Sequence, residues 1–235
     1  MSLMTPGPHR PRLPLFPLAD VVHFPRTELK LHVVEPASRR LVRDVIEQDE
    51  DARWIGVVLL KPGSGRDVAG LPEVFPGGTA GRLLDAELLP DGCSNILLHG
   101  EFRFRLRREV ADERQPYRQA LVEPVEEPWL NERDAGIMAV RSGIVALLHG
   151  LSAELGERFP FGDQELEELA ERCVFEELVN RIAADLDVPP LRKQQLLQEA
   201  LPDRGLSVLS ILRSRQQVID RLRPFRHLTD NHELN

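Results

Sequence analysis

The chain has 235 residues, 29% of them charged, which is the composition of a globular protein long enough for one large or two small domains. The net charge of −8 disfavours a nucleic-acid partner, since proteins that bind phosphate backbones usually carry a basic excess. The two cysteines, Cys93 and Cys173, form no CxxC pair, so neither a zinc site nor a disulfide framework is expected. No secretory leader and no apolar run of about 20 residues is evident, and we expect a cytoplasmic protein without a membrane partner.

Short or alternating apolar runs dominate the first half of the chain and predict about six β-strands. The opening stretch LPLFPLADVVHFP is expected to be an irregular or bulged edge strand, because its prolines lack the N–H that a central strand donates. One helix is expected at PASRRLVRDVIEQ, which begins with a proline and carries its apolar residues on one helical face. The remaining strands are expected within residues 28–34, 54–60, 80–110 and 117–125.

After residue 128 the apolar period becomes helical. The expected helices lie within residues 137–155, 166–186, 189–201 and 204–225. We therefore expect an α+β protein, with a β-rich domain at residues 1–127 and a bundle of about four helices at residues 128–235.

No catalytic or cofactor-binding constellation is evident in the sequence. The glycine-rich stretches KPGSGRD and PGGTAGR lack the Lys-Ser/Thr ending with which a nucleotide-binding loop holds phosphates. The seven histidines are scattered, and neither HExxH nor GxSxG occurs. We therefore expect no enzymatic activity, no metal site and no cofactor.

One charged feature is regular. In EFRFRLRR, apolar residues alternate with Arg103, Arg105 and Arg107, and a period of two places the arginines on one face of a strand. Such a row beside aromatic side chains suits contacts with RNA phosphates and bases. The alternative is a solvent-facing strand whose arginines pair with neighbouring glutamates, and the acidic balance of the chain favours that interpretation.

A series of short motifs follows a fixed order. Leu-Pro-Leu-Phe-Pro-Leu, Val-Val-His-Phe-Pro and Glu-Pro occupy residues 13–18, 21–25 and 35–36. Gly-Thr-Ala-Gly-Arg-Leu follows at residues 78–83, and a Leu-Pro-Asp-Gly turn with a Gly-x-x-Arg-Phe strand lies within residues 89–106. This order and spacing resemble the Lon substrate-binding domain, the N-terminal domain of Lon proteases.

The resemblance implies a PUA-like β-barrel followed by a helical extension. It also implies binding of unfolded or extended polypeptide, as the family domain does for its protease, so a protease is a candidate partner and an adaptor role in protein quality control is expected. The 235 residues contain neither the ATPase nor the peptidase domain, and we expect a stand-alone, non-catalytic Lon-domain protein.

Two sets of residues are candidates for binding. The apolar candidates for polypeptide are two phenylalanines of the opening stretch and three residues of the loop GLPEVFPGG: Phe16, Phe24, Leu71, Val74 and Phe75. The alternative function is RNA binding by a PUA-like protein through Arg103, Arg105 and Arg107.

Overall fold

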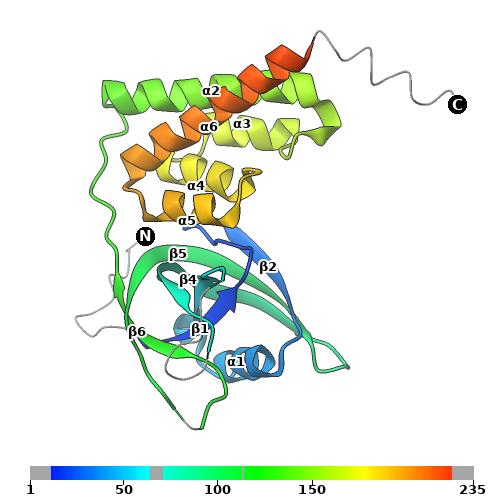
Figure 1. Ribbon diagram of the computed structural model, residues 1–235, viewed down its shortest axis with the longest axis vertical. Coiled ribbons are helices and arrows are strands. Elements are labelled where there is room, and N and C mark those ends of the chain that lie inside the picture. Colours follow the sequence, from blue (N-terminus) through cyan, green and yellow to red (C-terminus); the bar gives the residue numbers. More distant parts are fainter. Residues whose placement is uncertain (1–11, 64–70, 113, 224–235) are drawn as a thin grey trace, which may run out of the picture. The chain divides into compact units, whose positions relative to one another are not determined.

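The computed structural model describes residues 12–63, 71–112 and 114–223. Six β-strands and six α-helices are found in this part of the chain, which makes an α+β fold (Figure 1). The chain separates into two compact units. Residues 1–128 and 186–198 form the sheet unit, and residues 129–185 and 199–235 form the helical unit.

The six strands form one mixed sheet in the order β2-β5-β4-β3-β1-β6. β1 and β3 are parallel, and the other neighbours are antiparallel. β5 also pairs with β6, so the sheet closes on itself and leaves β2 outside the ring. The strands are β1 (Arg12–Leu18), β2 (Glu28–Val33), β3 (Trp54–Leu60), β4 (Val74–Leu88), β5 (Ser94–Glu109) and β6 (Gln119–Pro124).

Residues 13–18 of the proline-rich opening stretch lie in β1, between β3 and β6, so the expectation of an edge strand is wrong; residues 19–25 form no strand. Residues 12–14 pair with β6, whereas residues 15–18 pair with β3. Pro14 therefore pairs only with β6, and Pro17 pairs only with β3. Because each proline has one neighbouring strand, its missing N–H does not interrupt hydrogen bonding to a second strand.

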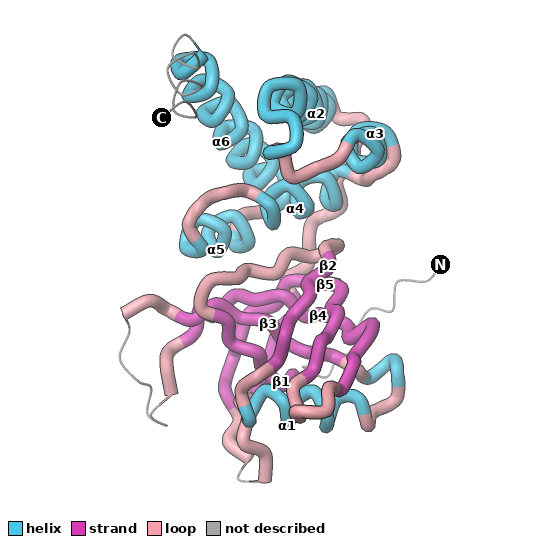
Figure 2. The backbone as a smooth tube through the Cα atoms, turned by 90° about the vertical axis from the view of Figure 1, so that its right-hand side faces the viewer, coloured by secondary structure: helices cyan, strands magenta, loops and turns pink. Residues whose placement is uncertain are grey.

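The core of the sheet unit has two apolar clusters. One lies under α1 (Pro36–Ile46), which covers one end of the sheet (Figure 2) and buries Leu41, Val42 and Val45. The other surrounds Phe104. At Gly78 a Cβ would lie 2.4 Å from the Val57 carbonyl oxygen and 2.8 Å from the Phe104 ring, so β4 approaches its neighbours closely only because this residue has no side chain.

The helical unit contains α2 (Ala135–Leu155), α3 (Asp163–Glu171), α4 (Phe175–Asp185) and α6 (Leu201–Leu222). α2 and α6 run parallel, because Leu209 packs at Gly143 and Gln216 lies one heptad further at Gly150. The Asp134 carboxylate caps α2 by accepting hydrogen bonds from the N–H groups of Gly136 and Ile137.

Five α-helices follow residue 128 in the described chain, where about four were expected. The pattern at residues 166–186 belongs to two helices, α3 and α4, because the chain leaves the helix at residues 172–174. The segment that follows them, α5 (Pro190–Gln198), lies in the sheet unit. That residues 1–127 fold without it stays a prediction.

One described segment, Ala135–Arg158, is long and apolar enough by length and composition to cross a membrane, with a mean hydropathy of 1.4. The sequence analysis, which considered only uninterrupted apolar runs, had not singled it out. A core helix passes the same test. α2 buries Ile137, Val140, Ile144, Leu148 and Leu151 along one face, and 22% of its most apolar 18-residue window is buried.

Candidate functional site

The two phenylalanines of the opening stretch lie inside the sheet unit. Phe16 is 7% exposed and belongs to the cluster beneath α1, and Phe24 is completely buried. Neither ring presents a surface to a ligand in this conformation. The expectation that Phe16 or Phe24 lines a groove is therefore not met by this arrangement of the chain.

The Thr79 side chain of β4, the Thr27 side chain just before β2 and the backbone of β5 at Gly100 hold the segment that contains Phe24. The Thr79 hydroxyl donates to the His23 carbonyl oxygen at 2.6 Å, and the Thr27 hydroxyl donates to the Phe24 carbonyl oxygen at 2.7 Å. A Cβ at Gly100 would lie 2.2 Å from that same oxygen of Phe24. The Gly-Thr block and the Gly-x-x-Arg-Phe strand are thus structural motifs that fix the opening stretch.

His23 is a buried ionisable residue that the sequence analysis did not single out. Its Nε2 atom lies 3.1 Å from the Thr27 carbonyl oxygen, and a Cβ at Gly81 or Gly100 would lie 3.3 or 3.1 Å from the ring. Burial lowers the pKa of His23 to about 4; the hydrogen bond with Thr27 opposes this change and nearby His99 adds to it. The imidazole is therefore neutral at pH 7.

Val74 and Phe75 belong to β4 rather than to a loop, while Leu71 precedes this strand and Gly70 lies outside the described residues. Val58 pairs with Gly78 and Leu60 pairs with Val74, so two steps along β3 correspond to four along β4. This bulge contains Phe75, and a bulge redirects the side chains of its strand.

The segment that leads into the bulge is bonded to neighbouring residues at Pro72 and Glu73. The Lys61 ammonium pairs with the Glu73 carboxylate at 2.8 Å, and the Arg118 guanidinium donates to the Pro72 carbonyl oxygen at 2.5 Å. Leu71 is 40% exposed, and Val74 and Phe75 are half-buried. The three apolar candidates thus lie within five consecutive residues of a fixed segment at the surface of the sheet unit.

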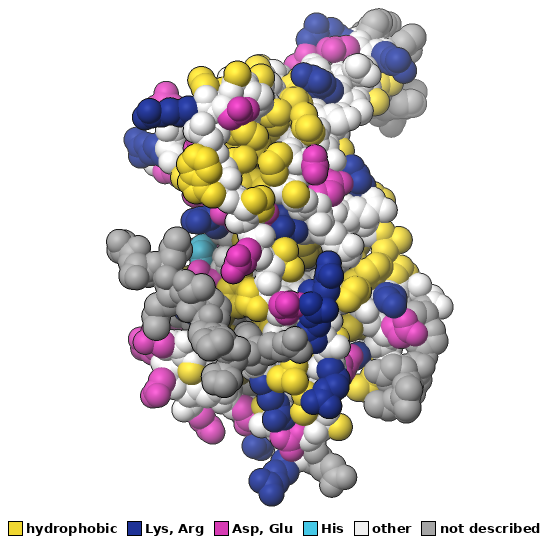
Figure 3. All heavy atoms as spheres, turned by 90° about the vertical axis from the view of Figure 1, so that its left-hand side faces the viewer, with side chains coloured by type: hydrophobic (Ala, Val, Ile, Leu, Met, Phe, Trp, Pro, Cys, Tyr) yellow, Lys and Arg dark blue, Asp and Glu magenta, His cyan; other side chains and the backbone are white. Residues whose placement is uncertain are grey.

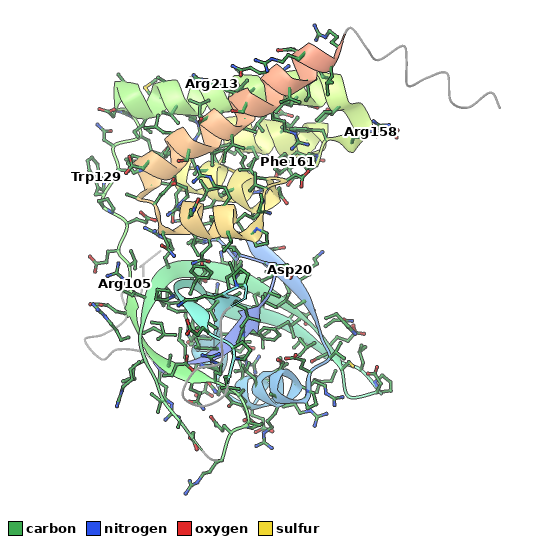
Figure 4. The ribbon with its side chains drawn as sticks, in the orientation of Figure 1. Asp20, Arg105, Trp129, Arg158, Phe161 and Arg213 are labelled. Atoms are coloured by element: carbon green, nitrogen blue, oxygen red, sulfur yellow. The ribbon has the colours of Figure 1, made fainter. Side chains whose placement is uncertain are left out.

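The three arginines of β5 do not form one exposed row. Arg103 is 7% exposed; it donates to the Leu197 carbonyl oxygen at 2.7 Å and pairs with the Glu127 carboxylate at 2.6 Å. Arg105 is exposed (Figure 4), and Arg107 is exposed and paired with Glu123. The expectation that all three face solvent is therefore corrected for Arg103.

The burial of Arg103 follows from the position of α5. Besides the bond from Arg103 to Leu197, the Gln194 side-chain amide donates to the Gly77 carbonyl oxygen at 2.9 Å. A helix more than 90 residues further along the chain thus covers the face of β5 that period-two alternation assigns to solvent. No local sequence signal reveals such a contact.

The described residues contain no group of three or more His, Cys, Asp or Glu side chains placed to hold a metal ion. Cys93 and Cys173 are free thiols.

Exposed apolar side chains also occur in the helical unit. Figure 3 shows hydrophobic side chains gathered on one of its faces. Trp129 is 87% exposed, Met138 52% and Leu206 53%. The sequence analysis did not single out any of these residues.

The closed mixed sheet with its helical unit defines a known class of fold. The N-terminal domain of Mycobacterium avium complex Lon protease superposes with a TM-score of 0.66 at 12% sequence identity, over 86% of this chain and 98% of that one. A Lon N-terminal domain protein from Xanthomonas campestris gives a TM-score of 0.53 at 25% identity, over 85% and 96% of the two chains. The fold is that of Lon N-terminal domains.

The sequence identifies the family. The family model for the ATP-dependent protease La (LON) substrate-binding domain matches residues 12–214, and the chain belongs to this family. Lon protease of Cytophaga hutchinsonii is 34% identical over 110 residues, 47% of this chain and 13% of that protein. Lon protease of Anaeromyxobacter dehalogenans is 27% identical over 210 residues, 88% and 24% of the two proteins. The chain thus spans less than a quarter of the length of these relatives.

Proposed function

We propose that this protein is a non-catalytic polypeptide-binding module that recognises unfolded or extended chains, acting as an adaptor in protein quality control with a protease as its partner. The match of residues 12–214 to a substrate-binding domain family carries the proposal. We infer further that its closed sheet is a PUA-like barrel, which the pairing of β5 with both β4 and β6 supports.

We propose that the segment with Leu71, Val74 and Phe75, here called the bulge surface, contacts the polypeptide. An apolar side chain that is half-buried in the free protein can complete its burial against a ligand without ordering a flexible loop first. The bonds to Pro72 and Glu73 supply that order in advance. Apolar burial on a fixed surface suits a ligand that is recognised by exposed hydrophobic side chains rather than by one sequence.

RNA binding receives less support. Arg103 is committed to Leu197 and Glu127, and Arg107 is paired with Glu123. On the face that Figure 3 shows, basic side chains of the sheet unit lie among acidic ones, which weakens the positive potential that a phosphate backbone requires.

A titration with a labelled, reduced and unfolded polypeptide tests the proposal. Phe75→Ala should weaken binding by about 2 kcal/mol, the scale of an aromatic anchor. Leu84→Ala is the matched control, because Leu84 lies on the same strand, is 46% exposed and lies outside the bulge surface. Parallel titrations with single-stranded RNA at low and high salt test the alternative. Tight, salt-sensitive binding of RNA with no binding of polypeptide would contradict the proposed function.

A further inference from the structure

Among the residues that the structure describes, nothing pairs with the outer edge of the strand β2. It pairs with β5 alone, whereas the other five strands form the ring. Its six residues, Glu28–Val33, lie opposite His99–Ser94 in continuous register, without a bulge and without a proline. Bulges, prolines, charged side chains and short length are the usual devices that keep a sheet edge from pairing with another chain; β2 lacks bulges and prolines but carries Glu28 and Lys30.

Alternation along the strand identifies the backbone groups at this edge. The Thr27 carbonyl oxygen accepts a hydrogen bond from the Gly100 N–H of β5 at 2.9 Å. Since successive residues of a strand direct their N–H and C=O groups to opposite sides, Leu29, Leu31 and Val33 also face β5. The outward groups then belong to Glu28, Lys30 and His32. Within the described chain, these three residues make no backbone hydrogen bond on that side.

The inner face of β2 is incompletely covered. Leu29 and Leu31 pack against the cluster beneath α1 but remain partly exposed, in contrast to the buried Val33 at the end of the strand. A further strand beside β2 would place its inward side chains next to these two leucines and extend the cluster by one strand. A strand that pairs with β2 would therefore need apolar side chains at alternate positions, where they would contact Leu29 and Leu31.

The outer face of β2 is polar and carries both signs of charge. Glu28, Lys30 and His32 are exposed, and the His32 ring lies 2.8 Å from the Asn95 side-chain oxygen. The Asn95 amide in turn donates to Glu87 at 2.9 Å, which links β2, β5 and β4. Because His32 is held in this ladder, Glu28 and Lys30 remain as the charges that an added strand would face.

We propose that β2 accepts an extended segment of the partner polypeptide as an additional strand, with alternate apolar side chains over Leu29 and Leu31 and an acidic side chain beside Lys30. This inference rests on the proposed function and specifies how part of the polypeptide is held. Backbone hydrogen bonds at a sheet edge require an extended conformation but no particular sequence, which suits a module that receives many unfolded chains.

N-methylated peptides test this mode of binding with the unaltered protein. The probe is a labelled eight-residue peptide in which valine alternates with glutamate and lysine, measured by fluorescence anisotropy. One version carries N-methyl groups on the valines and the other on the charged residues. An added strand uses only one of these two sets of N–H groups, so one version should bind at least about tenfold more weakly while the other stays within about threefold. Equal weakening by both versions, or by neither, would overturn the proposal.

A substitution in β2 tests the same strand-addition mode by altering the protein instead of the peptide. Lys30→Pro removes an N–H that faces away from β5 and should weaken the probe about tenfold, whereas Lys30→Ala keeps the N–H and should cost about threefold or less. Urea unfolding verifies that both variants remain folded. Equal affinities for the two variants would contradict the strand-addition mode.

Two further measurements separate this inference from the proposed function. If unfolded polypeptide binds but the probe shows no dependence on N-methylation, strand addition is wrong and the proposed function stands. If neither ligand binds, both are wrong. Analytical sedimentation tests whether β2 instead pairs with a second copy of the chain. A dimer that is abolished by Lys30→Pro but is not dissociated by the probe would also overturn the proposal.

Discussion

Lowering the pH from 8 to 5 should destabilise the sheet unit by about 2 kcal/mol through His23 alone. Burial lowers the pKa of His23 from 6.5 to about 4 in the folded chain. The unfolded chain therefore takes up the proton first as the pH falls, so the stability is fully present above about pH 6.5 and is lost toward pH 4. At about 1.4 kcal/mol per pH unit, the loss reaches about 2 kcal/mol at pH 5 and about 3 kcal/mol at pH 4.

The assay requires a signal from the sheet unit only. Trp129→Phe leaves Trp54 as the single tryptophan, and Trp54 lies in β3 with its ring centroid 5.7 Å from that of Phe102. Its fluorescence during urea unfolding gives the free energy of unfolding at each pH. Carboxylates also titrate in this range, so the measured quantity is the difference between the Trp129→Phe protein and the same protein with His23→Gln.

The expected result is that His23→Gln loses about 2 kcal/mol less than its parent between pH 8 and pH 5. Its amide retains a donor for the Thr27 carbonyl oxygen but takes up no proton. The matched control is His32→Gln, at an exposed histidine of the same unit, which should lose as much as the parent. If His23→Gln and its parent lose equal stability, the argument from burial is refuted.

Gly78→Ala should lower the free energy of unfolding by more than about 3 kcal/mol, because its Cβ would lie 2.4 Å from a carbonyl oxygen. Gly77→Ala, with its nearest neighbour at 3.5 Å, should stay within about 1 kcal/mol in the same urea assay, and equal effects would contradict this reasoning. A fragment of residues 1–127 should unfold cooperatively at lower urea than the whole chain, since it lacks α5; absence of a cooperative transition would show that α5 is indispensable. The purified chain should hydrolyse neither ATP nor casein, and turnover that a point substitution in the chain abolishes would refute the non-catalytic assignment.

The sequence pattern correctly predicted the strands and helices whose buried face is set by residues close to each other in the sequence. The strand at residues 54–60 and the helix that starts at Pro36 agree with the structure, because a buried apolar run and a one-sided helical stripe are both set within a few residues. The break between α3 and α4 was missed for the same reason. Apolar residues continue at helical spacing across residues 172–174, so the pattern alone gives no sign that the backbone leaves the helix.

The candidate binding residues depend on contacts that no local pattern encodes. Period-two alternation assigned Arg103 to solvent, but α5 supplies the Leu197 carbonyl oxygen and covers it. Phe24 looked available in a proline-rich stretch, yet Thr79 and Gly100 hold that stretch within the sheet unit. The open edge of β2 was likewise invisible, since the order of strands in a sheet is a property of tertiary structure.

The contact between Arg103 and α5 also sets an order of events during synthesis. Leu197, whose carbonyl oxygen accepts a hydrogen bond from Arg103, lies 94 residues after Arg103 in the sequence. At about 5–20 residues per second, a ribosome adds those residues in about 5–19 s. β1 to β4 precede that interval, and the rest of β5, β6 and Glu127 are made within its first part. The strands and Glu127 are therefore translated before α2, α3 and α4, and α5, which supplies the second partner of Arg103, is translated only after those three helices.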